Sequence, residues 1–124
     1  MTLAGRNVLL VGQNFQAAQI LIERLHRWNF RCHFAANVQE ANEFLATHAV
    51  DLVLSNTHLS DGTGYRLLMT LARLPVSAFL CVPVENSCLW LPAIDGGKKC
   101  LGLPALRPPE FAKELEEMAR CLST

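Results

Sequence analysis

The sequence predicts an α/β fold in which helices cover both faces of a doubly wound parallel sheet. Short runs of apolar residues without alternation, such as "NVLLVGQ" and "DLVLSN", are typical of strands that are buried on both faces. Amphipathic stretches with helical spacing follow these runs, and strands that alternate with helices favour a parallel sheet. A chain of 124 residues suits one domain, so residues 1–124 are expected to form a single domain.

Five strands and four regular helices are expected along the chain. Asn14 and Asn37 each offer a side-chain oxygen that can cap the first and second helices. Pro75 ends the third helix, because the residue before a proline avoids helical angles. Pro108 suits the first turn of the last helix, where the missing N–H has no helical partner. The expected strands are residues 7–13, 31–36, 51–56, 76–82 and 98–103.

Residues 85–97, "ENSCLWLPAIDGG", do not fit a regular helix, although the alternation requires one there. Pro92 lies in the middle of the segment and two glycines close it, so we expect a short or distorted helical turn. Three consecutive apolar residues cannot all face one side of a helix. At least one of the three is therefore expected to be exposed and to form an interaction surface, with the tryptophan as its anchor: Leu89, Trp90 and Leu91.

Composition excludes several classes of function. Eleven basic residues balance eleven acidic ones, whereas nucleic-acid binders usually carry a basic surplus on one face. No run approaches the ~18 apolar residues of a membrane span, and the start "MTLAGRN" lacks the apolar core of a signal peptide. We therefore expect a cytoplasmic protein that binds neither nucleic acid nor membrane.

The cysteines and histidines do not predict a metal site. The five cysteines are an odd number and contain no Cys-x-x-Cys pair, so buried free thiols are favoured over a disulfide framework or zinc. The four histidines are scattered, without the i, i+4 spacing of paired ligands. We expect no metal and no cofactor. The cysteines are Cys32, Cys81, Cys88, Cys100 and Cys121.

Three stretches in the right order resemble the receiver domain of bacterial response regulators, the CheY-like, flavodoxin-like fold. They are "NVQEANEFLATHAVDLVLSN", "LSDGTGYRLL" with Gly64 at the usual glycine, and "GGKKCLGLP" with Gly96 and Pro104 at the usual positions. The resemblance covers almost the whole chain. It implies the strand order 2-1-3-4-5, the first and last helices on one face, and a role in a two-component or phosphorelay pathway.

The residues that carry the family's chemistry are replaced at every matching position. The family uses an aspartate as phosphoacceptor, two acidic residues that hold Mg²⁺, a hydroxyl, an aromatic switch and a lysine. Here the phosphoacceptor falls on Asn56 and the acidic pair on Gly12 and Gln13. The hydroxyl falls on Cys81, or on Leu80 or Val82 in another register, the aromatic on Cys100, and the lysine on Leu103.

These replacements are consistent with one another electrostatically. An amide nitrogen is not a nucleophile, so Asn56 cannot accept a phosphoryl group. Once the acids are gone, a lysine in the pocket would be an unpaired, partly buried charge, and a leucine avoids that cost. The matched set predicts a degenerate receiver, or pseudo-receiver, which is not an enzyme. It would act by binding a protein: a histidine kinase, an output domain or a second copy of itself.

Two other functions remain open. A small ligand could occupy the neutral pocket formed by Gln13, Asn56, Cys81 and Leu103, or Ser55 or His58 could accept a phosphoryl group instead of Asn56. The remaining acids do not restore the family's site. Asp51 begins its strand and so lies at the opposite end of the sheet, and Asp61 is expected to be a turn residue.

Overall fold

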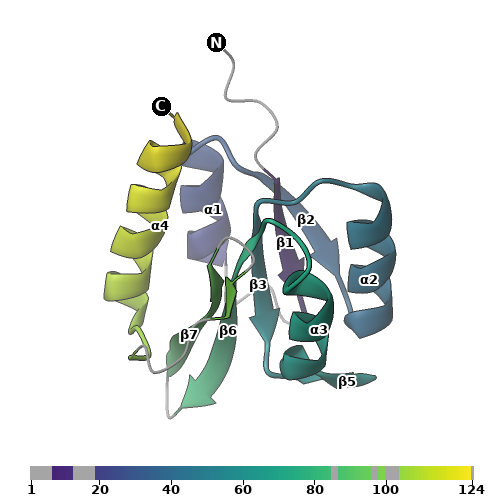
Figure 1. Ribbon diagram of the computed structural model, residues 1–124. Helices are drawn as coiled ribbons and strands as arrows, with labels where there is room; N and C mark the ends of the chain where they lie inside the picture. Colours follow the sequence, from purple (N-terminus) through teal and green to yellow (C-terminus); the bar gives the residue numbers. More distant parts are fainter. Residues whose placement is uncertain (1–6, 13–18, 85–86, 96–97, 100–103, 124) are drawn as a thin grey trace.

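The computed structural model describes residues 7–12, 19–84, 87–95, 98–99 and 104–123 (Figure 1). Strands and helices alternate along the first part of the chain, up to residue 84, as the sequence predicts. The elements are β1 (Asn7–Val11), α1 (Gln19–Arg27), β2 (Arg31–Ala35), α2 (Val38–Thr47), β3 (Leu52–Asn56), β4 (His58–Leu59), β5 (Gly62–Thr63), α3 (Gly64–Leu71), β6 (Ser77–Val84), β7 (Ser87–Asp95), β8 (Lys98–Lys99) and α4 (Pro108–Ser123).

The main sheet has the strand order β2-β1-β3-β6-β7-β8. The first four strands in this order are parallel, with Val8 opposite Leu52 and Leu54 opposite Phe79. The order of the first four predicted strands is therefore confirmed. β1 and β3 lie in the middle and are buried on both faces, which explains why their sequences are apolar without alternation.

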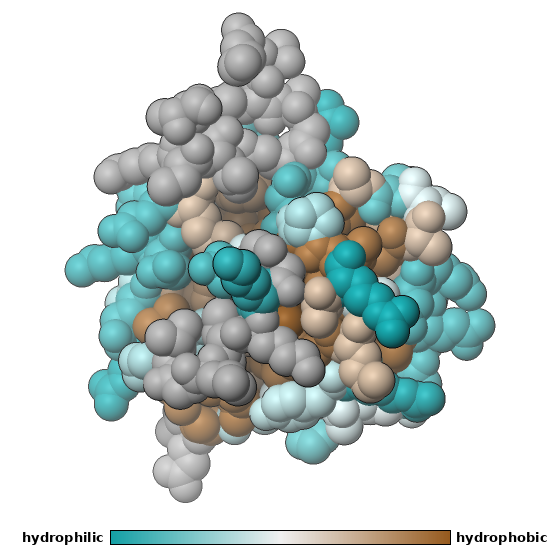
Figure 2. Space-filling model, viewed as in Figure 1, coloured by the Kyte–Doolittle hydropathy of each residue, from teal (hydrophilic) through white to brown (hydrophobic). Residues whose placement is uncertain are grey.

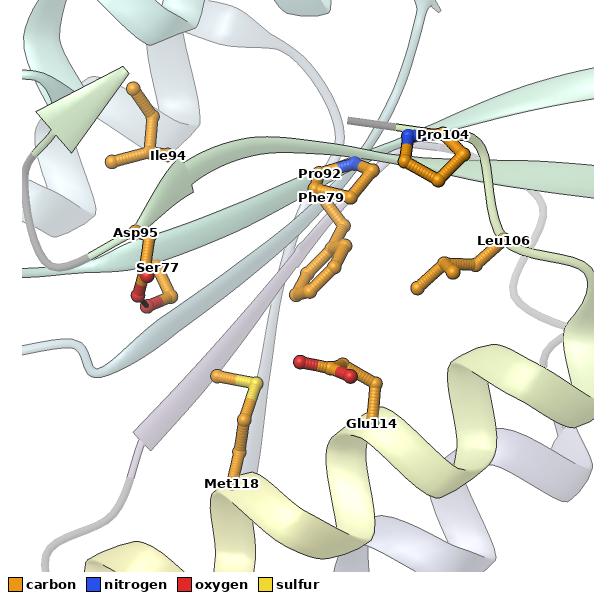
Figure 3. A pocket seen from close by; sticks show the side chains of 9 residues that line it. All are labelled: Ser77, Phe79, Pro92, Ile94, Asp95, Pro104, Leu106, Glu114 and Met118. Atoms are coloured by element: carbon orange, nitrogen blue, oxygen red, sulfur yellow. Dashed lines mark hydrogen bonds between the residues drawn. The ribbon is translucent and has the colours of Figure 1, made fainter. Parts of the chain in front are cut away.

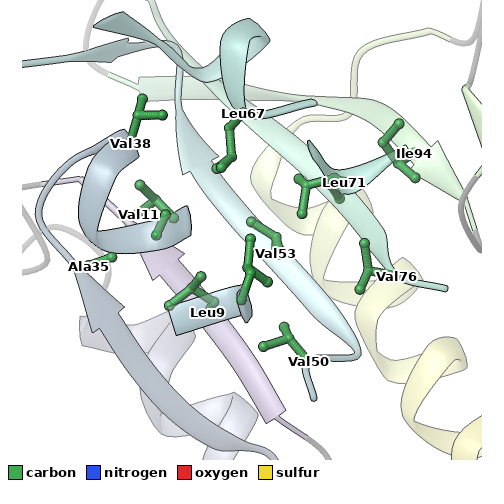
Figure 4. Close-up of a cluster of buried hydrophobic side chains, with 13 residues drawn as sticks. Leu9, Val11, Ala35, Val38, Val50, Val53, Leu67, Leu71, Val76 and Ile94 are labelled. Carbon is green, nitrogen blue, oxygen red and sulfur yellow. The ribbon is translucent and has the colours of Figure 1, made fainter. Parts of the chain in front are cut away.

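Helices cover both faces of the sheet (Figure 1). On one face, α2 and α3 enclose a core to which Leu9 and Val53 contribute from the strands and Leu67 and Leu71 from α3 (Figure 4). On the other face, α1 and α4 pack over a second core. The first and last helices thus share a face, as predicted. The main side chains of this second core are Val8, Leu10, Leu25, Phe30, Leu52, Leu54, Phe79, Trp90, Phe111 and Leu115.

The segment predicted to be a short or distorted helical turn is instead the strand β7, and this prediction is wrong. β7 follows β6 in a hairpin and pairs with it antiparallel from Ala78↔Ile94 to Val84↔Ser87. Pro92 is tolerated because the register shifts beside its partner Phe79, and a proline fits a strand at such a bulge. Cys88 and Trp90 pack into one core while Ile94 packs into the other.

This hairpin also changes the fifth position of the predicted order 2-1-3-4-5. β7 occupies the place beside β6 that was predicted for a parallel strand at residues 98–103. Of that predicted strand, Lys98 and Lys99 form β8 and pair antiparallel with β7, and residues 100–103 lie outside the described residues. The sheet is therefore mainly parallel, with an antiparallel addition at one edge.

Capping fixes the start of α2 as predicted. The Asn37 side chain accepts a hydrogen bond from the Glu40 N–H at 2.9 Å. The Asp61 carboxylate, from the turn between β4 and β5, accepts further bonds from the Val38 and Gln39 N–H groups at 2.8 and 3.0 Å. These contacts satisfy backbone donors that have no partner inside the helix. The predicted cap of the first helix, Asn14, lies outside the described residues.

Candidate functional site

Asn56 lies at the carboxyl end of β3, against the backbone of Gly12 at the end of β1. Gly12 has φ +140°, and its N–H donates to the Ala35 carbonyl at 2.9 Å. A Cβ atom on Gly12 would overlap the side-chain amide nitrogen of Asn56 and lie 2.8 Å from its Cγ. The neutral amide of Asn56 therefore occupies the space that a side chain at position 12 would need.

Cys81 lies beside Asn56 on the neighbouring strand. The register of β3 and β6 pairs the two residues directly. The backbone N–H and the hydroxyl of Thr57 both donate to the Cys81 carbonyl at 3.2 Å, which ties the end of β3 to β6. Burial, and then the nearby Cys88 thiol, raise the pKa of Cys81 to about 12. The Cys81 thiol is therefore neutral at physiological pH.

The structure brings together three of the residues that the sequence analysis singled out, Gly12, Asn56 and Cys81. The other members of the predicted pocket lie outside the described residues. These are Gln13, Cys100 and Leu103.

The helix α3 begins directly against this edge of the sheet, at Gly64. The Gly64 N–H donates to the Thr57 carbonyl at 2.9 Å. A Cβ atom on Gly64 would lie 2.5 Å from the Asn56 carbonyl oxygen and 2.8 Å from a methyl group of Leu80. Only glycine allows so close an approach, so Gly64 fixes the distance between α3 and the strand end.

The other polar residues considered in the sequence analysis do not form a second reactive group beside Asn56. Ser55 is 3% exposed, and its hydroxyl donates to the Asn56 carbonyl at 2.9 Å, whereas His58 is exposed. The hydrogen bond from the Val38 N–H is the main cause that lowers the pKa of Asp61, which is thus a capping residue. Asp51 accepts a hydrogen bond from the Asn7 N–H at the opposite end of β3.

The described residues offer little to a metal ion. Among them, no group of three or more histidine, cysteine, aspartate or glutamate side chains converges on one point. At the edge formed by Gly12, Asn56 and Cys81, the available groups are an amide, a neutral thiol and backbone carbonyls. Mg²⁺ is usually held by carboxylates, and these residues do not fit it.

Comparison with known proteins establishes the family. No protein-family model matches the chain. The two-component response regulators ORR8 of the indica and japonica subspecies of rice, Oryza sativa, are each 33% identical to it over 82 residues. The match covers 65% of this chain and 68% of the relative. The chain belongs to the response-regulator receiver family.

Solved structures show the same fold. The signal receiver domain of an HD-domain-containing protein from Pseudomonas fluorescens is 27% identical with a TM-score of 0.59. That match covers 69% of this chain and 64% of the other. The receiver domain of the sensor histidine kinase PA1611 from Pseudomonas aeruginosa has a TM-score of 0.63 at 20% identity, covering 98% of this chain and all of the other.

Trp90 of this receiver domain is buried, so the prediction that it is an exposed anchor is wrong. Its side chain is 9% exposed and stacks on Phe111 of α4, with ring centroids 4.2 Å apart and an interplanar angle of 11°. Its backbone exchanges two hydrogen bonds of 2.8 Å with Leu106. The alternation of β7 places Trp90 on the α4 face of the sheet, which the expectation of a helical turn did not foresee.

Leu89 and Leu91 of the receiver domain face the opposite side of the hairpin. Leu91 pairs with Leu80, whose methyl group lies against α3, and Leu89 pairs with Val82. Paired residues share a face, so these side chains belong to the α3 side of the sheet. Leu89, Leu91 and Val82 are half-buried, and Val84 at the end of β6 is 43% exposed.

This apolar surface, which we call the hairpin face, consists of Val82, Val84, Leu89 and Leu91. Only residues 85–86 separate β6 from β7, too few for the helix that the alternation predicts between them.

Two large apolar side chains one turn apart on α3 are also exposed, Tyr65 at 56% and Met69 at 73%. Figure 2 shows hydrophobic surface near the centre of one side of the molecule, between hydrophilic surfaces over α4 and α2.

A cavity of about 300 Å³ lies between the β6–β7 hairpin and α4 (Figure 3). Phe79 and Met118 contribute apolar walls, and the carboxylates of Asp95 and Glu114 stand at its sides. None of its lining residues belongs to the neutral pocket proposed for a ligand, so this cavity does not support that alternative. The lining residues are Ser77, Phe79, Pro92, Ile94, Asp95, Pro104, Leu106, Glu114 and Met118.

Within the described ranges, none of the helices combines the length and the apolar character needed to cross a bilayer.

Proposed function

We propose that this receiver domain is a pseudo-receiver, which signals by binding a protein partner and without aspartate phosphorylation. The packing of the Asn56 amide on Gly12 carries the proposal. In the family, this edge of the sheet holds a nucleophilic aspartate and acidic metal ligands. Here the corresponding space contains a neutral amide over a residue without a side chain, so it offers neither a nucleophile nor a charge that attracts a cation.

The surroundings of Asn56 support the same interpretation. The neighbouring Cys81 thiol stays protonated because burial raises its pKa to about 12. Ser55, an alternative phosphoacceptor, is buried and already donates its hydrogen bond. The edge is therefore neutral at physiological pH. Because it contains no buried charge, it needs no bound ion to compensate one.

A phosphodonor assay tests the proposal. The protein is incubated with acetyl phosphate and Mg²⁺, and its intact mass is measured. We expect no phosphoryl adduct on the wild type, and none on Asn56→Asp, because one carboxylate restores neither the metal ligands nor the lysine. A known phosphorylatable receiver in the same buffer serves as the positive control. A stable adduct that maps to Ser55, His58 or any residue of this edge would contradict the proposal.

The relatives suggest the kind of partner. Because they are two-component response regulators, we propose a partner from such a pathway: a histidine kinase, an output domain or a second copy of this chain. The similarity to the receiver domain from Pseudomonas fluorescens supports the further proposal that the pathway is in the bacterial cytoplasm. The hairpin face is proposed as the contact surface, with Leu89 and Leu91 retained from the predicted surface. Its side chains are half-buried or exposed, and apolar side chains that adjoin one another on a surface are typical of protein contact sites.

Paired substitutions test this surface. Leu89→Thr together with Leu91→Thr keeps the β-propensity of β7 and removes apolar area. We expect binding to a candidate histidine kinase, or self-association in sedimentation, to weaken. Met69→Gln is the matched control, since it removes an exposed apolar side chain from α3. Equal effects of the two changes, or no effect of either, would contradict the assignment of the surface.

A further inference from the structure

The β6–β7 hairpin brings two cysteines together on the α4 face of the sheet. Cys81 pairs with Trp90, and Cys88 pairs with Pro83, so the two cysteines are diagonal neighbours across the hairpin. Residues two apart on a strand share a face, which places both thiols on the side of Trp90. Both side chains are half-buried and pack against the core beneath α4. The two thiols lie near enough to interact, since the Cys88 side chain contributes, after burial, to the raised pKa of Cys81.

We propose that Cys81 and Cys88 are a redox-sensitive thiol pair that forms a reversible disulfide across the hairpin. The proposal rests on the register and the shared face, and it goes beyond the proposed loss of phosphorylation. The cysteine count alone did not indicate it, because the pairing depends on β7 being a strand.

The diagonal geometry predicts a strained and therefore easily reduced bond. Diagonal neighbours in an antiparallel pair have Cα atoms about 7–8 Å apart, whereas a relaxed disulfide spans about 4.4–6.8 Å. Closing the bond requires β7 to move toward β6 or to shift along it. Strained disulfides have the higher reduction potentials that are typical of regulatory rather than structural bridges.

The reaction balances with a low-molecular-weight disulfide as oxidant. One thiol loses its proton to solvent and attacks the oxidant, which forms a mixed disulfide and releases one thiol of the oxidant. The second cysteine then loses its proton and displaces the other half of the oxidant. The protein loses two hydrogens and gains one S–S bond, while the oxidant is reduced to two thiols. Because the Cys81 thiolate is disfavoured by burial, we assign the first attack to Cys88.

The bond would act on the hairpin face. The Cys81 carbonyl accepts both hydrogen bonds from Thr57, and Cys81 pairs with Asn56. Cys88 adjoins Leu89 on the hairpin face. A shift of β7 relative to β6 would therefore change the hairpin face while the end of β3 remains attached to β6.

Oxidation by glutathione disulfide tests the proposal on the full chain. We expect the wild type to lose two hydrogen masses, and peptide mapping to find one bridge between Cys81 and Cys88. Excess reduced glutathione should remove the bridge. Cys88→Ser should not lose these hydrogens. Cys81→Ser should instead accumulate a mixed disulfide with glutathione at Cys88, because the second cysteine is missing. Cys32→Ser, which alters a cysteine on β2, should behave as the wild type.

Several results would overturn the proposal. These are the absence of the bridge in the folded protein, a bridge to another cysteine in its place, or a bridge that persists in excess reduced glutathione. Alanine variants of Cys81 and Cys88, checked for native circular dichroism, keep the test valid if a serine variant does not fold. They are expected to give the same results as the serine variants.

Discussion

At the carboxyl end of β3, the contact between the Asn56 side chain and Gly12 explains why this edge of the sheet is uncharged. The Asn56 amide fills the space above Gly12, so the two residues constrain each other. With this backbone, a side chain at position 12 would require the Asn56 side chain to move. An aspartate at position 56 would have no acidic partner on the described part of β1. The identities of both residues were available from the sequence, but their contact was not, because it depends on side-chain positions.

Gly12→Ala is expected to lower the free energy of unfolding by about 1–3 kcal/mol, through backbone strain at φ +140° and overlap with Asn56. In an Asn56→Ala background the loss should be smaller, because the overlap is gone. Gly62→Ala is the matched control: Gly62 has φ +157°, but a Cβ there would make only ordinary contacts, with the Arg66 side chain at 3.4 Å and a methyl group of Val38 at 3.8 Å. Urea unfolding measures all four variants. Additive effects of Gly12→Ala and Asn56→Ala would show that the contact is absent.

The lowered pKa of Asp61 predicts how the free energy of unfolding depends on pH in the acid range. The Val38 N–H lowers its pKa in the folded protein, so the folded state favours the carboxylate. Its contribution to stability is present above the unfolded pKa of about 3.9 and is lost as the pH falls through the lower, folded value. Asp61→Asn should therefore be less stable than the wild type at pH 6, with a difference that shrinks toward pH 2. Urea unfolding across this range is the measurement, and a constant difference would contradict the capping role.

At the scale of elements, the hairpin is where prediction from sequence failed. Asn37 was identified as a helix cap, and Pro108 as the start of α4, because capping and proline effects are local. Residues 85–97 were expected to be helical only because alternation requires a crossover helix. Their apolar run is compatible with a strand, and pairing with β6, a nonlocal interaction, decides between the two. Trp90 changes from expected anchor to core residue for this reason alone.

Trp90→Ala should therefore behave as a core substitution. We expect a loss of about 3–5 kcal/mol in the free energy of unfolding, because the stacked contact with Phe111 is removed and a void is left. Urea unfolding, with the intrinsic fluorescence of Trp28 or circular dichroism as the probe, measures it. Leu89→Ala, on the half-exposed face of the same strand, is the control and should cost clearly less. A loss below about 1 kcal/mol for Trp90→Ala would show that Trp90 is not packed against α4.

At the scale of the whole molecule, the parallel order β2-β1-β3-β6 places the ends of β1, β3 and β6 side by side. The resemblance to receivers predicted this arrangement, and the fold and the family relationship agree with it. In such sheets ligands bind at the carboxyl ends of the strands. At that edge this receiver domain has Gly12, Asn56 and Cys81, none of which is charged at physiological pH, and the β6–β7 hairpin adds an apolar face nearby.

The most direct test of signalling without phosphorylation is a two-dimensional ¹H–¹⁵N NMR titration of the full chain with Mg²⁺, followed by acetyl phosphate. The backbone amides of Gly12, Asn56 and Cys81 report on the edge itself, and those of Leu89 and Leu91 on the hairpin face. We predict that none of these resonances shifts in a saturable way at millimolar Mg²⁺, before or after the phosphodonor is added. Saturable shifts at Gly12 and Asn56, transmitted to Leu89 or Leu91, would contradict the proposed function.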